Sequence, residues 1–112
     1  MIEKTNEAGF KQMLDGVRLK SMVHGAVTHL TEVRFVKGAV VPEHQHPHEQ
    51  TGYLISGSLL FFGAGEDTVV TPGDCWNFAS GIPHGAEALE DSVVIEVFSP
   101  IREDYLPDAT DD

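Results

Sequence analysis

The chain has 112 residues, which is the usual size of one domain with one hydrophobic core. Its 18 acidic and 7 basic residues give a formal net charge of −11. This argues against nucleic acid and against an anionic membrane surface as partners, because both are bound through lysine and arginine. An anionic small molecule would be repelled at long range and would need a local positive feature, such as a metal ion or a placed arginine.

Cysteine content and hydropathy further limit the class of protein to which the chain can belong. Cys75 is the only cysteine, which excludes an intramolecular disulfide and a zinc site made of several cysteines. The first ten residues, MIEKTNEAGF, contain no apolar signal region, and no stretch approaches the ~20 apolar residues of a membrane span. We therefore expect a cytoplasmic protein.

Short apolar runs follow one another along most of the chain. Residues 1–16 form an N-terminal segment whose pattern allows a short helix. From residue 17 onward, alternating runs are separated by glycine and proline, which is typical of an all-β sandwich or barrel. Strands are expected at residues 17–24, 26–36, 51–57, 58–63, 66–74, 75–79, 84–90 and 92–99. Alternation in residues 26–36 places every second side chain from Val27 to Phe35, His29 included, on one face.

The stretch HQHPHEQ, residues 44–50, concentrates polar side chains that can bind a metal. In an extended strand His44 and His46 point to the same side, and Gln50 has the same parity after a bend at Pro47. One further ligand must come from elsewhere, and His84 follows a glycine-proline turn at the start of a late strand. Histidines from an early and a late strand suit a metal inside a small barrel.

Two neighbours in the same stretch compete for the role of ligand. His48 and Glu49 are close in sequence and chemically able to bind a metal. Glu49 has the opposite strand parity and is expected to face away, and His48 is expected at the rim of the pocket. The alternative for the whole stretch is a histidine-rich surface loop, which the additional histidine at position 84 disfavours.

A glutamate interrupts the most apolar strand, SVVIEVFS, residues 92–99. By parity Glu96 shares a face with Val94 and Phe98, and Phe98 favours the inside of the barrel for that face. A carboxylate there would have a pKa raised by desolvation and lowered by a nearby metal, so it is a candidate general acid or base. The alternative is a solvated glutamate on the outer face.

An arginine follows this strand. Arg102 can reach back over the barrel mouth as a bidentate clamp for a carboxylate, or form a surface ion pair with Glu103 or Asp104. Beyond the expected barrel, residues 17–102, the chain ends in an acidic tail at 103–112, and its last residues, 108–112, are expected to be disordered.

The spacing of the candidate ligands resembles the first motif of the cupin superfamily. Gly38, His44, His46, Gln50 and Gly57 match G-x5-H-x-H-x3-E-x6-G, with glutamine in place of the usual glutamate. The resemblance assigns the fourth ligand position to Gln50. It implies one cupin domain, a jelly-roll barrel (double-stranded β-helix) of two antiparallel sheets, and a homodimer.

The second cupin motif, G-x5-P-x-G-x2-H, is matched by Gly73, Gly81 and His84. Ala79 replaces its proline and Ala88 replaces its terminal asparagine; neither position holds a metal ligand. The two motifs together imply one divalent ion, held by three histidines and Gln50. Zinc, nickel, manganese, iron and copper are not distinguished by such a site.

The C-terminal pattern E-x-F-S-P-x-R-E-D-Y-L resembles the KdgF-type single cupins of pectin and alginate degradation. These enzymes convert 4,5-unsaturated monouronates to the linear 5-keto-4-deoxyuronate. The resemblance implies that Glu96, Phe98 and Arg102 complete the site, with Glu96 in the place of an aspartate. We assign proton movement to Glu96, carboxylate anchoring to Arg102, and apolar walls to Phe98 with Trp76.

Three other functions remain open at this point. Some single-domain polyketide cyclases share three histidines and a glutamine, and an apolar, aromatic-lined lumen would favour that chemistry. An oxygenase would require iron, although the neutral glutamine suits iron oxygenases less well than a carboxylate ligand does. A non-catalytic metal- or sugar-binding cupin would be favoured if Glu96 faced outward and the protein filled every coordination position of the metal.

Overall fold

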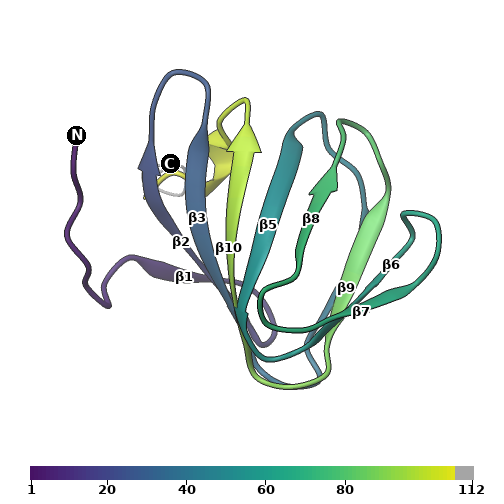
Figure 1. Cartoon of the computed structure of the whole chain (residues 1–112). Coiled ribbons are helices and arrows are strands. Elements are labelled where there is room, and N and C mark those ends of the chain that lie inside the picture. Colours follow the sequence, from purple (N-terminus) through teal and green to yellow (C-terminus); the bar gives the residue numbers. More distant parts are fainter. Residues whose placement is uncertain (108–112) are drawn as a thin grey trace.

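The computed structural model describes residues 1–107, which form ten strands and a short 3₁₀ helix, η1 (Figure 1). A six-stranded sheet has the order β1-β2-β3-β10-β5-β8, and a four-stranded sheet has the order β4-β9-β6-β7. Every strand pair is antiparallel, so the expected all-β fold of two antiparallel sheets is confirmed. The elements are β1 (Phe10–Leu14), β2 (Val17–His24), β3 (His29–Phe35), β4 (Val40–His44), β5 (Glu49–Ser56), β6 (Leu59–Phe62), β7 (Thr68–Val70), β8 (Cys75–Phe78), β9 (His84–Ala88), β10 (Ser92–Ser99) and η1 (Glu103–Tyr105).

The N-terminal segment forms a strand where the sequence allowed a helix. Strand β1 pairs with β2 at the edge of the six-stranded sheet, with Phe10 opposite Lys20. The Arg34 guanidinium lies 4.2 Å from the centre of the Phe10 ring. Pairing satisfies main-chain groups that an unpaired edge of β2 would leave to water, and this tertiary contact overrides local helix preference. The expected disorder of residues 108–112 lies outside the described residues.

Strands β3 and β10 carry the expected period-two alternation. In β3 the buried side chains are those of His29, Thr31, Val33 and Phe35. Val27 was expected on the same face but is 63% exposed, because it belongs to the turn before β3. In β10 the side chains from Ser92 to Phe98 alternate between buried and half-buried positions.

The interior has an apolar end and a polar end. Nine apolar side chains form the core cluster: Val17, Leu19, Val33, Phe35, Leu54, Leu59, Val70, Ala88 and Val94. The two sheets converge at this end and diverge at the other, where β5 and β9 begin and β10 ends (Figure 1). The predicted site residues lie at the divergent end. Among residues 1–107, no helix has the length and hydropathy needed to cross a membrane.

Candidate metal centre

Three histidines meet at the divergent end of the barrel. His44 ends β4 and pairs in register with His84 at the start of β9, and their ring centres are 4.5 Å apart. His46 lies in the loop after β4, 5.1 Å from the His84 ring, so the expectation that His44 and His46 share one strand is wrong. The main-chain N–H of Gly81 donates to the His46 carbonyl at 2.9 Å and fixes this loop. One nitrogen from each histidine lies within 4.8 Å of the other two.

All three imidazoles are oriented by main-chain carbonyls. The Nδ1 atoms of His44, His46 and His84 lie 2.9, 3.0 and 2.8 Å from carbonyl oxygens two residues away in the chain. A carbonyl oxygen only accepts, so each Nδ1 carries the hydrogen and each Nε2 keeps a lone pair. This hydrogen bonding on the far nitrogen is the arrangement that orients metal-binding histidines.

The cluster also has the electrostatics of a metal site. Burial, together with the charges of Arg102 and the neighbouring histidines, lowers the pKa of His46 to about 4. Burial also lowers the pKa of His84. Metal ions bind the neutral imidazole, which is the form that these shifts favour. Among the described residues, the buried Nε2 of His84 has no hydrogen-bond partner, so its lone pair is available to a cation.

Gln50, at the start of β5, joins the histidines to the rest of the site. Its Oε1 lies 3.1 Å from Nε2 of His46, so two lone-pair atoms face each other. Such a contact is unfavourable without a positive charge between the atoms, and a divalent ion would supply one. The residues present therefore fit a metal. Gln50 as the fourth ligand stays a prediction.

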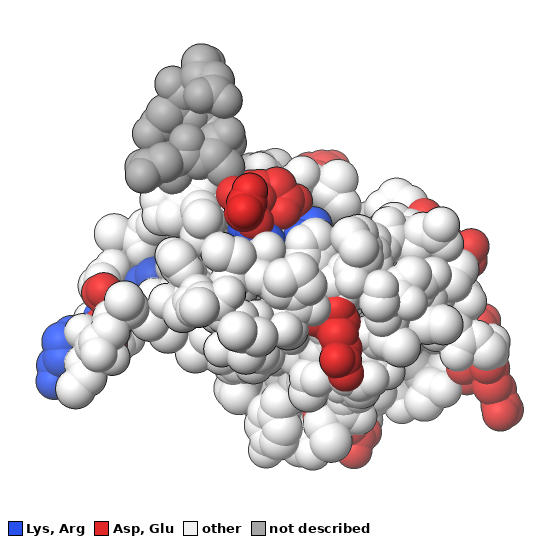
Figure 2. Space-filling view, turned by 90° about the horizontal axis from the view of Figure 1, so that it is seen from above, with Lys and Arg blue, Asp and Glu red and all other residues white. Residues whose placement is uncertain are grey.

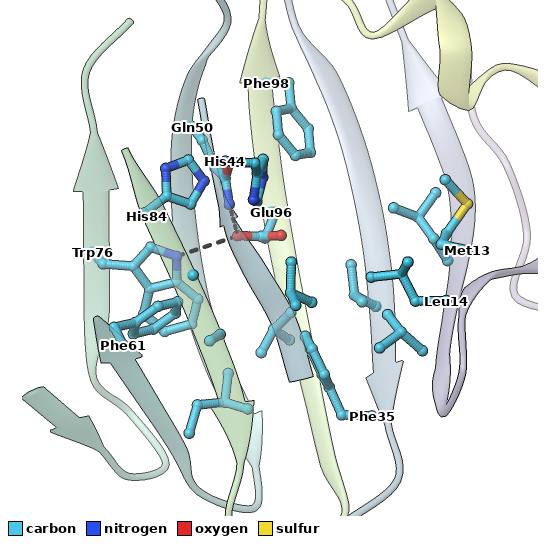
Figure 3. A pocket seen from close by; sticks show the side chains of 18 of the residues that line it. Met13, Leu14, Phe35, His44, Gln50, Phe61, Trp76, His84, Glu96 and Phe98 are labelled. Atoms are coloured by element: carbon cyan, nitrogen blue, oxygen red, sulfur yellow. Dashed lines mark hydrogen bonds between the residues drawn. The ribbon is translucent and has the colours of Figure 1, made fainter. Parts of the chain in front are cut away.

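The amide of Gln50 also reaches the carboxylate of Glu96. Gln50 Nε2 donates to Glu96 Oε2, and Trp76 Nε1 donates to the same oxygen at 3.3 Å (Figure 3). Glu96 is only 8% exposed, and its burial raises the pKa of the carboxyl, against the opposing effects of these two donors and of Arg102. Among residues 1–107, no hydrogen bond reaches Glu96 Oε1. The Oε1 atom is therefore free to exchange a proton with a ligand.

The strand register explains how Trp76 reaches Glu96. Gly52 of β5 pairs with Glu96 of β10 on one side and with Trp76 of β8 on the other. A Cβ atom on Gly52 would lie 2.2 Å from the indole ring, so only glycine lets Trp76 lie across β5. Phe61 of the opposite sheet packs on the other side, with ring centres 4.7 Å apart.

Arg102 is buried, and its side chain forms the ion pair considered from the sequence. Its Nε and Nη2 donate to the two carboxylate oxygens of Asp104 in η1, at 3.0 and 2.8 Å. The guanidinium lies 4.0 Å from the centre of the Tyr105 ring and 5.1 Å from that of Phe98. It therefore faces the interior while it is paired with a residue at the surface.

The remaining predicted residues occupy three different environments. Phe98 is buried, and its ring centre is 6.0 Å from that of His46. His48 lies 5.5 Å from the His46 ring; its Nδ1 is buried without a partner in the described part of the chain, and burial lowers its pKa. Glu49 is exposed and accepts a hydrogen bond from Asn77 at 2.9 Å, so it faces away from the cluster.

A cavity of about 100 Å³ connects the polar end to the core. Its polar lining includes His44, Gln50, His84, Glu96 and Arg102, and apolar side chains such as Val33 and Phe35 line its inner end. Figure 2 looks onto the divergent end of the barrel and shows acidic side chains spread over that face, with little basic surface. A positively charged group inside the barrel would thus be surrounded by a negatively charged protein surface.

Sequence reasoning missed several contacts that shape this site. Asp104 was considered only as a surface partner of Arg102, and Tyr105 and Gly52 were not considered. From the sequence, His29 is expected only to share a strand face with Val33 and Phe35; its Nδ1 accepts a hydrogen bond from the main-chain N–H of Arg102 at 3.2 Å. The inward parity of His29 was the one signal in the sequence for this contact.

Comparison with known proteins identifies the family. The profile of the cupin domain family matches residues 31–99. The pectin degradation protein KdgF of Dickeya dadantii (strain 3937) is 32% identical over 103 residues, which cover 90% of this chain and 94% of that protein.

Solved structures agree with this assignment. The structure of KdgF from Halomonas sp. superposes with a TM-score of 0.84 at 37% identity, covering 89% of this chain and 94% of that one. An RmlC-like cupin from Shewanella frigidimarina also reaches a TM-score of 0.84, at 26% identity, over 89% and 90% of the two chains. Both comparisons extend well beyond the two short sequence motifs.

The histidine cluster leads to a prediction about metal affinity. Loss of a residue that supports a metal ligand costs roughly 10- to 100-fold in affinity, so His84→Ala, which removes a predicted ligand, should lose at least about 100-fold. Titration with zinc or nickel in a calorimeter measures this. His24→Ala, at a histidine outside the cluster, should leave the affinity unchanged; equal losses in both variants would contradict the assignment.

Gly52 leads to a second prediction. In Gly52→Ala the new methyl group displaces the Trp76 indole, which removes its hydrogen bond to Glu96 and destabilises the protein by ~1–3 kcal/mol through overpacking. Trp76 is the only tryptophan, so its fluorescence spectrum reports the displacement directly, and urea unfolding gives the stability. Gly25→Ala is the matched control, because a Cβ at Gly25 meets nothing within 4 Å. An unchanged spectrum in Gly52→Ala would contradict the packing described above.

Proposed function

Because the chain belongs to the cupin family and is a relative of KdgF, we propose that it is a metal-dependent enzyme acting on an unsaturated sugar acid. The proposed reaction opens the ring of a 4,5-unsaturated monouronate and gives the linear 5-keto-4-deoxyuronate. The substrate is then a small anion, which fits a positive centre inside an otherwise acidic protein.

The observation that carries the proposal is the placement of Glu96. Its carboxylate is buried beside the histidine cluster, with one oxygen held by Gln50 and Trp76 and the other without a hydrogen bond from the described residues. Burial raises its pKa toward the range in which a carboxyl group can both accept and return a proton.

The reaction needs a proton taken at one atom and a proton delivered at another. Glu96 takes the proton of the C1 hydroxyl as the bond between C1 and the ring oxygen breaks, leaving an aldehyde at C1 and an enolate at C5. Glu96 then returns a proton to C4, which converts the enolate to the C5 ketone. The proton taken from the C1 hydroxyl balances the proton given to C4, so one carboxyl group is sufficient for both transfers.

The other residues would bind and orient the sugar. A divalent ion held by His44, His46, His84 and Gln50 would supply a fixed positive charge that polarises sugar oxygens. With a neutral glutamine in place of a carboxylate, that charge would be the full +2 of the ion. Arg102 would bind the carboxylate of the substrate, and Phe98 with Trp76 would form apolar walls that exclude water.

The cavity and its residues bear differently on the three other candidate functions. The apolar inner lining of the cavity favours aromatic cyclisation as the second candidate, whereas the neutral Gln50 suits an iron oxygenase less well than a carboxylate would. A non-catalytic binding protein was to be favoured by an outward-facing Glu96, but this side chain is 8% exposed and lines the cavity. The homodimer implied by the cupin resemblance stays a prediction.

The direct test is kinetic. Metal-loaded protein mixed with a 4,5-unsaturated monouronate should accelerate the loss of ultraviolet absorbance from its conjugated double bond, relative to a protein-free blank. General acid–base catalysis contributes about 10²- to 10⁴-fold, so Glu96→Gln should slow the reaction by that factor.

Glu49→Gln is the matched control for this test. Glu49 is the residue beside Gln50, but its exposed side chain bonds Asn77 on the outer face of the sheet. Its substitution should change the rate less than about twofold, as is usual for surface positions. No acceleration by wild-type protein with an occupied metal site would end the proposed function and leave the cupin fold and the metal centre standing.

A further inference from the structure

The guanidinium group of Arg102 has one fully occupied edge. Asp104 accepts hydrogen bonds from Nε and Nη2 in the bidentate geometry that fixes the plane of the group. The Tyr105 ring lies against one face of that plane, 4.0 Å from Cζ. The side chain of Arg102 is 10% exposed and that of Asp104 is 59% exposed, so the pair joins a buried cation to the surface.

The main chain of Arg102 is held separately. Its N–H donates to Nδ1 of His29, whose Nε2 lies 2.8 Å from the Ser21 hydroxyl. An N–H only donates, so Nδ1 of His29 carries the lone pair and Nε2 carries the hydrogen. His29 is completely buried, and desolvation lowers its pKa, which keeps the ring in this neutral form.

These contacts leave one guanidinium nitrogen of Arg102 without a partner. Nη1 is buried and has no hydrogen-bond partner among the described residues. A buried donor of a charged group costs free energy when it is unsatisfied, so a ligand with an acceptor is favoured at this position. Arg102 lines the cavity that also contains Glu96, and a bound molecule can therefore reach both residues.

We propose that Asp104 and His29 are positioning residues, which hold Arg102 by its side chain and its main chain so that Nη1 is presented to a ligand carboxylate. This inference rests on the proposed function for the identity of the ligand, a uronate. The opposite role for Asp104 is competition, in which its carboxylate occupies the arginine and must leave before the substrate binds. The occupied Nε–Nη2 edge and the free Nη1 favour positioning, because a guanidinium can bind one carboxylate on each edge.

The two roles predict opposite changes in affinity. Asp104→Asn keeps the shape of the side chain and removes its charge, so Arg102 loses its restraint. If Asp104 positions Arg102, the metal-loaded variant should bind saturated galacturonate, an unreactive uronate, roughly five- to tenfold more weakly than wild type does. Calorimetric titration measures this affinity. Tighter binding in Asp104→Asn would overturn the inference and establish competition.

Glu103→Gln is the matched control, since it removes the same charge from the adjacent, exposed position of η1. Its affinity should stay within about twofold of wild type, as for most surface substitutions. A loss equal to that of Asp104→Asn would show a general effect of charge and would overturn the assignment to Asp104.

His29 is tested by a conservative pair of variants. In His29→Gln the new side-chain oxygen can still accept a hydrogen bond from the main-chain N–H of Arg102. In His29→Leu the new side chain fills the space but offers no acceptor. Galacturonate affinity should be retained within about threefold in the first variant and fall about tenfold in the second. Equal affinities in the two folded variants would remove His29 from the inference without affecting the result for Asp104.

Nitrogen-15 NMR of the arginine side chains separates this inference from the proposed function. Wild-type Arg102, assigned with Arg102→Lys, should show distinct Nη1 and Nη2 signals that merge in Asp104→Asn, and acetate should shift Nη1. Identical signals in both proteins, or an Nη1 signal that neither acetate nor galacturonate moves, would overturn the inference. Absence of uronate turnover with the expected arginine signals would instead end only the proposed function.

Discussion

The register of β10 between β3 and β5 is the constraint on which both the core and the site depend. The face of β10 that places Val94 in the apolar cluster also places Glu96 beside Gln50 and Trp76. A slip by one residue would turn the whole face outward, exposing Val94 and removing the carboxylate from the cavity together. Stability thus selects the register that the proposed chemistry requires, and a buried glutamate is tolerated because two donors reach it in that register.

Gln50 explains how the histidine cluster and a buried carboxylate coexist at contact distance. An amide has an acceptor at one end and a donor at the other, so Oε1 can face the histidine cluster while Nε2 donates to Glu96. A glutamate at this position would place two carboxylates against each other, which would force one of them to take up a proton. The departure from the usual cupin glutamate is therefore compatible with a second acidic residue, Glu96, in the same barrel.

Features set by local alternation could be predicted from the sequence, and features set by contacts between distant segments could not. Period-two patterning located eight of the ten strands, all except β1 and β4, together with the inward face of β10, and the spacing of the histidines indicated their convergence. The N-terminal strand β1 depends on the free edge of β2, which local propensity does not report. Similarly, the contact of Trp76 with Glu96 requires a glycine in the strand between them, and the contact of His29 with Arg102 joins residues 73 positions apart.

The acidic surface around the barrel mouth has a consequence for the kinetics of an anionic ligand. Like charges at the entrance slow the approach of an anion, while the positive charge of Arg102 inside acts only at short range. Added salt screens the outer charges over about 10 Å at 0.1 M, yet it screens buried groups much less. Capture of an anion should therefore become faster as ionic strength rises, the reverse of the behaviour of enzymes that attract their substrates electrostatically.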